Sequence, residues 1–195
     1  MGADAEQRGF AGLDLVGFGP NGTPIGGVLL GPAWSEGRLA PLADALHRKF
    51  AATVGATGHS LPASADPDQV EAGETALFCI GAHMAGLPLN PQITSLGGRF
   101  VRDATTAPCY RLFALGNRPG MIRDDNGAAI VGEVWALPTS SIGALLAQVP
   151  PPLGFGSVTL EDGPCLGFVA ESAGVADARE ITHLGCWRAW LRSGD

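Results

Sequence analysis

The segment Leu77–Gln92, LFCIGAHMAGLPLNPQ, constrains the fold most, because it joins a short apolar run to a loop of small and turn-forming residues. Its first four residues are apolar and long enough for a buried strand. Gly81, Gly86 and Pro88 then end regular structure, and the glycines let backbone N–H groups approach a ligand closely. His83 is the ionisable side chain at this break. The segment therefore predicts a strand that ends at a functional loop.

Composition places the chain among globular proteins. Of its 195 residues, 46% are hydrophobic and 16% are charged, and a chain of this length buries roughly two thirds or more of its unfolded surface. No apolar run approaches a membrane span, and the first ten residues lack the basic and apolar regions of a signal peptide, so we expect a cytoplasmic protein without a membrane partner. The cysteines form no CxxC pair and are expected to be reduced, packed thiols: Cys79, Cys109, Cys165 and Cys186.

The charge is unevenly distributed along the chain. Residues 1–76 carry a net charge of −5, residues 77–123 carry +4 and residues 124–195 carry −6, for a total of −7. The total disfavours nucleic acid as a partner, whereas the basic block surrounds the glycine-histidine loop. Its cations are all arginines, which hold carboxylate or phosphate oxygens in a bidentate manner: Arg99, Arg102, Arg111, Arg118 and Arg123. We expect a small anionic ligand, without distinguishing a carbamate from an amino acid or a phosphate, and most of these arginines would lie on solvated faces.

The chain divides near residues 60–74, where Pro, Ala, Ser and acidic residues replace hydrophobic periodicity. Before this linker, a strand is predicted over Gly26–Gly31 and an amphipathic helix over Ser35–Val54, with Ser35 as its N-cap. The helix has apolar residues at helical spacing: Leu39, Leu42, Leu46 and Phe50. One strand and one helix cannot form a core alone. This segment must pack on the second half, on another subunit or on a larger parent domain.

Strand patterns dominate after the linker. Strands are predicted over Thr75–Ile80, Arg99–Thr105, Cys109–Leu115, Ala128–Ala136, Gly156–Leu160 and Leu166–Glu171. Helices are predicted over Ser140–Gln148 and, with a weaker pattern, Ala178–Leu184. The fold class expected is α+β, with a mixed or antiparallel, barrel-like sheet and a few helices.

Five separated motifs occur in order from residue 77 onward: GAHMAGLPLNPQ, TAPCYRLFAL, AAIVGEVWALP, VPPPLGFGSVTLEDG and ITHLGCWRAWL. Together they resemble the C-terminal domain of allophanate hydrolases, which implies a γ-glutamyl cyclotransferase-like fold for residues 75–195. The earlier stretches PNGTPIGGVLLGPAWSEGRLAPLADALHRKF and GATGHSLP resemble the tail of the amidase-signature domain that precedes it. We therefore assign residues 1–60 to an amidase remnant and residues 61–74 to a linker, and an amidase domain or a second copy is a candidate partner. The single lysine, Lys49, lies outside any Gly/Ser-rich core, so the amidase Ser-Ser-Lys triad is absent from this sequence.

The resemblance implies decarboxylation of N-carboxycarbamate, the product that the amidase domain makes from allophanate during urea breakdown. Such a site needs a proton donor and fixed donors to anionic oxygens. His83 is the expected donor, and no metal or organic cofactor is expected; His47, His59 and His183 are expected to be structural or exposed. The remaining candidates are the backbone at Gly81, Ala82, Gly86 and Leu87, the nearby Asn90, the cations Arg99 and Arg102, and Tyr110 as a pocket residue.

Glu133 is also a candidate substrate-binding residue, because an acid inside an apolar strand is costly to bury unless it is paired or functional. Related cyclotransferases carry their catalytic glutamate in a later LDxxEG-like turn, where this chain has no carboxylate. The loop there contains Gly154 and Gly156, which would close over a small ligand or form a plain turn. Two alternatives stay open: a non-catalytic assembly or dimerisation module, and a cyclotransferase-like enzyme that would need Glu133 or Glu171 in its pocket.

Overall fold

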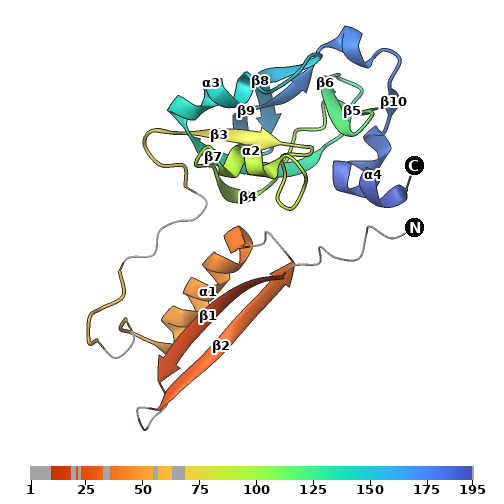
Figure 1. Ribbon diagram of the computed structural model, residues 1–195. Coiled ribbons are helices and arrows are strands. Elements are labelled where there is room, and N and C mark those ends of the chain that lie inside the picture. Colours follow the sequence, from red (N-terminus) through yellow and green to blue (C-terminus); the bar gives the residue numbers. More distant parts are fainter. Residues whose placement is uncertain are drawn as a thin grey trace. The chain divides into compact units, whose positions relative to one another are not determined.

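The structure is a computed structural model, which describes residues 10–18, 21, 23–32, 36–54, 57–62 and 69–194. The chain divides into two compact units, residues 1–67 and residues 68–195 (Figure 1). Among the described helices, none combines the length and the apolar character needed to cross a membrane.

Unit 1 consists of a β-ribbon and a helix. Strands β1 (Phe10–Phe18) and β2 (Pro24–Pro32) pair antiparallel along their whole lengths, and helix α1 (Glu36–Phe50) contacts β1 and β2. The predicted strand lies within β2 and the predicted helix corresponds to α1, whereas β1 was not predicted. Ser35 and its predicted cap lie outside the described residues.

The apolar spacing on α1 does not produce a fully buried stripe within this unit. Leu42 is 51% exposed and Phe50 is 72% exposed, whereas Ala43 is buried. Ala43 is thus the buried contact of the helix, Leu39 and Leu46 are partly buried, and Leu42 and Phe50 remain accessible.

Unit 2 is built on a mixed five-stranded sheet in the order β4-β7-β3-β9-β8. Its strands are β3 (Glu74–Cys79), β4 (Arg99–Thr105), β7 (Val131–Pro138), β8 (Leu153–Leu160) and β9 (Gly163–Ala170). Neighbouring strands pair antiparallel except for β3 and β9, which are parallel. The hydrophobic core lies largely on this sheet, and β7 is buried along most of its length because its residues face packed layers on both sides.

The two edges of this sheet meet, so the sheet is barrel-like as predicted. Thr106, which follows β4, forms an isolated bridge with Leu160 at the end of β8. The Ala107 N–H donates to the Thr159 carbonyl at 2.9 Å, and the Glu161 N–H donates to the Thr105 carbonyl at 3.0 Å. Closure supplies partners for backbone groups that an open edge would expose.

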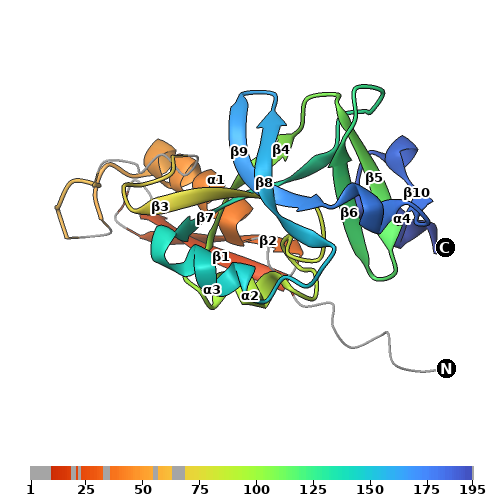
Figure 2. The same ribbon diagram turned by 90° about the horizontal axis from the view of Figure 1, so that it is seen from above.

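A second sheet, in the order β10-β5-β6, lies at one end of unit 2 together with helix α4 (Trp187–Ser193) (Figure 2). Its strands are β5 (Tyr110–Leu115), β6 (Arg118–Arg123) and β10 (Arg179–Glu180). The other helices are α2 (Asn90–Thr94) and α3 (Ile142–Leu146), with 3₁₀ turns η1 (Thr139–Ser141), η2 (Ser172–Val175) and η3 (Thr182–Leu184). The predicted strands all occur with bounds shifted by up to three residues, whereas β6, β10, α2 and α4 were not predicted.

The helix predicted over Ala178–Leu184 is wrong. Arg179 and Glu180 instead pair with β5, and the guanidinium of Arg111 holds the Glu180 carboxylate in an ion pair that lowers its pKa to about 2. The hydroxyl of Thr182 accepts a bond from the Leu112 N–H at 2.9 Å. These cross-strand contacts outweigh a weak helical pattern.

The junction between the end of β4 and the end of β8, which forms the barrel seam, leads to a prediction about stability. Thr106 is fully buried, and its hydroxyl oxygen accepts the N–H of buried Ile130 at 2.9 Å. Thr106→Val keeps the size of the side chain but leaves that N–H without an acceptor. We expect the free energy of unfolding, measured by urea denaturation, to fall by about 1–3 kcal/mol. An unchanged value would show that the seam does not depend on this bond.

Candidate functional site

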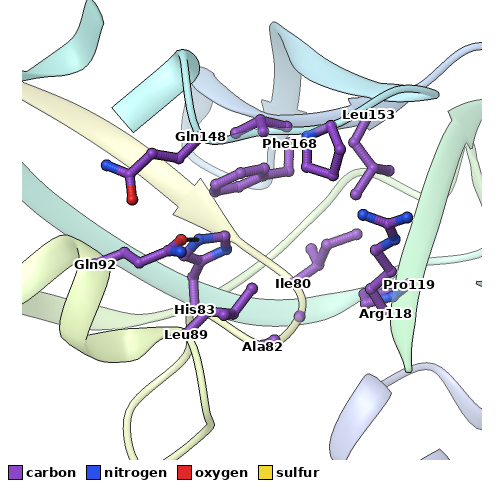
Figure 3. Close-up of a pocket in the computed structure, with 13 residues that line it drawn as sticks. Ile80, Ala82, His83, Leu89, Gln92, Arg118, Pro119, Gln148, Leu153 and Phe168 are labelled. Carbon is purple, nitrogen blue, oxygen red and sulfur yellow. Dashed lines mark hydrogen bonds between the residues drawn. The ribbon is translucent and has the colours of Figure 1, made fainter. Parts of the chain in front are cut away.

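A small cavity of about 50 Å³ opens where β3 ends. A buried water needs roughly 10–15 Å³ of such space, so the cavity has room for a small molecule. Figure 3 shows His83 and Gln92 on one side of it and Arg118 on the other. The lining residues come from the loop after β3, from α2, β6 and β9, and from the loop before β8 with the first residue of that strand: Ile80, Gly81, Ala82, His83, Leu89, Gln92, Arg118, Pro119, Gln148, Val149, Pro150, Leu153 and Phe168.

His83 is held on two sides. Its ring stacks on Phe168, with ring centroids 4.6 Å apart and an interplanar angle of 15°. Its Nε2 lies 2.9 Å from Oε1 of Gln92, and because that oxygen only accepts hydrogen bonds, the proton of the neutral ring resides on Nε2. Nδ1 points away from Gln92 and has no hydrogen-bond partner in the described part of the chain.

Burial lowers the pKa of His83 from its ordinary value of 6.5, and the hydrogen bond to Gln92 opposes this shift only in part. The imidazole is therefore predominantly neutral at pH 7. In that state Nδ1 is a free acceptor that can take up a proton.

The backbone beside His83 forms a candidate anion cradle, which consists of the N–H groups of Ala82 and His83. The Gly81 carbonyl accepts the Met84 N–H at 2.9 Å, and the Ala82 carbonyl accepts the Leu89 N–H at 2.9 Å. In a trans peptide the N–H points opposite to the C=O, so these bonds fix the directions of the Ala82 and His83 N–H groups. Neither N–H donates to any described residue. Two adjacent free N–H groups at the rim of a cavity suit an anionic oxygen.

The side chain of Asn90 completes the outer support of this cradle. Asn90 is buried, and its Nδ2 donates to the His83 carbonyl at 2.8 Å. Three successive carbonyl groups, those of Gly81, Ala82 and His83, thus each have a donor among residues 84–90.

Arg118 brings a positive charge to the same cavity from β6. Its Nε is buried without a hydrogen-bond partner, and its guanidinium forms no ion pair within the described residues. An unsatisfied buried donor of this kind is uncommon in native proteins and indicates a missing partner. The approach of β6 depends on Gly81, because a Cβ there would lie 2.5 Å from Cγ of Pro119.

Glu133 lies outside the cavity although it is almost fully buried. Its Oε2 accepts the Ala85 N–H at 2.7 Å and the Trp135 Nε1–H at 3.0 Å, and its Oε1 accepts Nη2 of Arg188 at 2.7 Å. Three donors satisfy the carboxylate, so its burial needs no ligand.

The structure brings together Gly81, Ala82 and His83 of the residues singled out from the sequence. The Leu87 N–H is not a free donor, because it bonds to the Met84 carbonyl at 3.0 Å, and neighbouring Gly86 has φ +72° in an exposed turn. Gly86, Leu87 and Asn90 thus shape the loop without lining the cavity.

Other candidates lie elsewhere. Arg99 is paired with Glu74 at 2.7 Å, and Arg102 with Asp162. The hydroxyl of Tyr110 accepts the Thr159 N–H at 2.8 Å in the core. Gly154 and Gly156 lie within β8, whose preceding loop, not its glycines, lines the cavity.

Among the lining residues that were not predicted as site residues, Arg118, Gln92 and Phe168 bear most on the chemistry of the cavity. Arg118 was one of five arginines in the basic block, and nothing in the sequence separated it from the others. Gln92 and Phe168 carry no charge and resemble any polar helix residue or core aromatic. The described residues contain no cluster of three or more His, Cys, Asp or Glu side chains suited to a metal.

The buried imidazole generates a prediction about pH. Because the pKa of folded His83 lies below 6.5, the unfolded chain binds more protons as the pH falls through this value. The stability that a neutral His83 provides is therefore present in full above about pH 6.5 and is lost towards the folded pKa. We expect His83→Gln to lose less stability than the parent protein between pH 7.5 and 5, and the NMR titration midpoint of His83 to lie below 6.5. A midpoint at or above 6.5 would show that burial does not control this ring.

Comparison with known proteins agrees with this architecture. The family model "Allophanate hydrolase C-terminal domain" matches residues 75–192. Urea amidolyase of Saccharomyces cerevisiae is 32% identical, and the match covers 90% of this chain and 11% of that protein. This chain thus spans about a tenth of the length of the curated relatives it matches.

Solved structures extend the comparison. Kluyveromyces lactis allophanate hydrolase is 28% identical with a TM-score of 0.62, and the match covers 95% of this chain and 34% of that one. A protein specific to uropathogenic E. coli is 41% identical with a TM-score of 0.60, covering 61% of this chain and 96% of its own. The predicted α+β fold class with a barrel-like sheet is confirmed, whereas the amidase origin of residues 1–60 and the linker over 61–74 stay predictions. The chain belongs to the family of allophanate hydrolase C-terminal domains, which form part of urea amidolyases.

Proposed function

We propose that unit 2 promotes the loss of CO₂ from N-carboxycarbamate, with His83 as the proton donor. One observation carries the proposal: the unpartnered guanidinium of Arg118 shares a small cavity with His83 and with two free backbone N–H groups. This arrangement suits a small, planar dianion, which N-carboxycarbamate is. Membership of the allophanate hydrolase C-terminal family supports the same substrate.

The reaction balances as ⁻O₂C–NH–CO₂⁻ + H⁺ → CO₂ + H₂N–CO₂⁻. One C–N bond breaks, its electron pair stays on nitrogen, and nitrogen takes one proton. Arg118 would hold one carboxylate through charge-assisted hydrogen bonds, and the N–H groups of Ala82 and His83 would hold the other. The departing carboxylate becomes neutral CO₂, so a small and largely apolar cavity favours its release.

Nδ1 of His83 would deliver the proton. The ring is neutral when the cavity is empty, because burial lowers the pKa of His83. A dianion beside it favours the charged imidazolium and so raises that pKa. Oε1 of Gln92 accepts the Nε2–H in either state, which leaves Nδ1–H directed to the substrate nitrogen.

The lining of the cavity disfavours cyclisation of a γ-glutamyl compound. Cyclotransferase chemistry needs a carboxylate base, and the lining contains no acidic residue. Glu133 is occupied by its three donors, and Glu171 is exposed and does not line the cavity.

The first test measures catalysis. An isolated amidase domain from an allophanate hydrolase generates N-carboxycarbamate in situ, and CO₂ release is followed with and without this protein. We expect acceleration, and we expect His83→Asn to lower it by about 10²–10⁴-fold, the usual contribution of a general acid. Arg123→Gln on the same strand as Arg118 serves as the control and is expected to behave like the parent protein. Folded protein without any acceleration would overturn the lyase proposal in favour of an assembly module.

The second test measures anion binding. Malonate has CH₂ in place of NH and keeps both carboxylates. We expect Arg118→Gln to weaken malonate binding, measured by calorimetry, by at least about 30-fold, because a buried charge-assisted contact contributes roughly 2 kcal/mol or more. Arg123→Gln removes the same charge outside the cavity and should bind malonate normally. Equal losses in the two variants would show that Arg118 acts only through the general field.

A further inference from the structure

An ion pair between buried Glu133 and partly exposed Arg188 lies next to the loop that carries His83, and neither residue lines the cavity. The sequence pattern placed Glu133 among the substrate-binding residues. We propose instead that Glu133 and Arg188 are positioning residues, which grip Ala85 and thereby fix the cradle N–H groups and the His83 ring. The proposal rests on the proposed function, in which that cradle and His83 act on the substrate.

Glu133 and Arg188 together bind both backbone polar groups of Ala85. The Ala85 N–H donates to Oε2 of Glu133 at 2.7 Å, and the Ala85 carbonyl accepts Nη2 of Arg188 at 2.7 Å. The same Nη2 donates to Oε1 of Glu133 at 2.7 Å, so the two side chains and the backbone form a closed ring of hydrogen bonds. The Trp135 Nε1–H, which donates to Oε2, fixes the carboxylate itself.

Glu133 and Arg188 are far apart in the sequence, and the fold brings them together. Glu133 on β7 is paired with Cys79, the last residue of β3, so its side chain is placed next to the start of the loop. Arg188 lies in the first turn of α4, 55 residues further along the chain. The loop is thus anchored to the central sheet and to the C-terminal helix at one point.

The position of Ala85 affects the candidate anion cradle because Ala85 lies within a short hydrogen-bonded turn. Ala85 follows Met84, whose N–H holds the Gly81 carbonyl and whose carbonyl accepts the Leu87 N–H at 3.0 Å. A rotation of the peptides around Ala85 would therefore release the Gly81 carbonyl, and the Ala82 N–H would lose its direction. His83 would shift with it and lose its stacking on Phe168.

Glu133→Gln separates charge from shape. The glutamine oxygen can still accept the Ala85 N–H, but its NH₂ group opposes Nη2 of Arg188. We expect malonate to bind about tenfold or more weakly, because a support that loosens misplaces the groups it holds. We also expect faster amide hydrogen exchange confined to residues 81–90. Arg188→Gln removes the partly exposed member of the pair. It should give the same weaker malonate binding and faster exchange if Glu133→Gln fails to fold.

Thr106→Val is the matched control, since it removes a buried hydrogen bond at the barrel seam, away from this loop. A merely structural role for Glu133 predicts that both variants change malonate affinity equally for equal loss of stability, and that result would overturn the proposal. Parental affinity and parental exchange in both pair variants would also overturn it. If the parent protein neither binds malonate nor releases CO₂, the proposed function fails. Exchange in residues 81–90 and the ring-current shift of His83 then decide the positioning role alone, and their change in Glu133→Gln supports it.

Discussion

The candidate site depends on the burial of one carboxylate. Removing Glu133 from water costs several kcal/mol, and the structure offsets this cost only because three donors converge on its two oxygens. Each donor comes from a different element: the loop after β3, β7 itself, and α4. Because no single donor suffices, the carboxylate is stable only when all three elements are in place. The fold of unit 2 and the conformation of the His83 loop are therefore coupled through this residue.

The arginines of the basic block show why the cavity, and not the charge of the block, defines the site. Arg99, Arg102 and Arg111 each have a carboxylate partner, and Arg123 contacts the Thr159 hydroxyl at 3.4 Å. Arg118 alone among these five has no partner within the described residues, and its Nε is buried. Four of these arginines thus have partners on the domain, and Arg118 is the one that lines the cavity.

The sequence was sufficient for most of unit 2 because its strands alternate or are continuously apolar and end at turn residues. It located His83 and its glycines, since a strand that stops at Gly81 needs no tertiary information to be recognised. It missed β6, where two arginines, a proline and a glycine obscure the pattern. It also failed to place Glu133, whose partner Arg188 is 55 residues away. Contacts of this range follow from sheet order and helix docking, which local patterns do not encode.

Charge balance gives the proposed reaction an internal check. The empty cavity holds one cation, Arg118, and a neutral His83, so a bound dianion leaves one negative charge uncompensated. Uptake of one proton at Nδ1 restores neutrality, and this is the same proton that the substrate nitrogen needs when the C–N bond breaks. After CO₂ leaves, the carbamate monoanion faces one arginine and a neutral histidine again. A low pKa for the unliganded histidine therefore suits the proposed cycle, because a ring that regained its charge at once would hold the carbamate monoanion more tightly and slow its release.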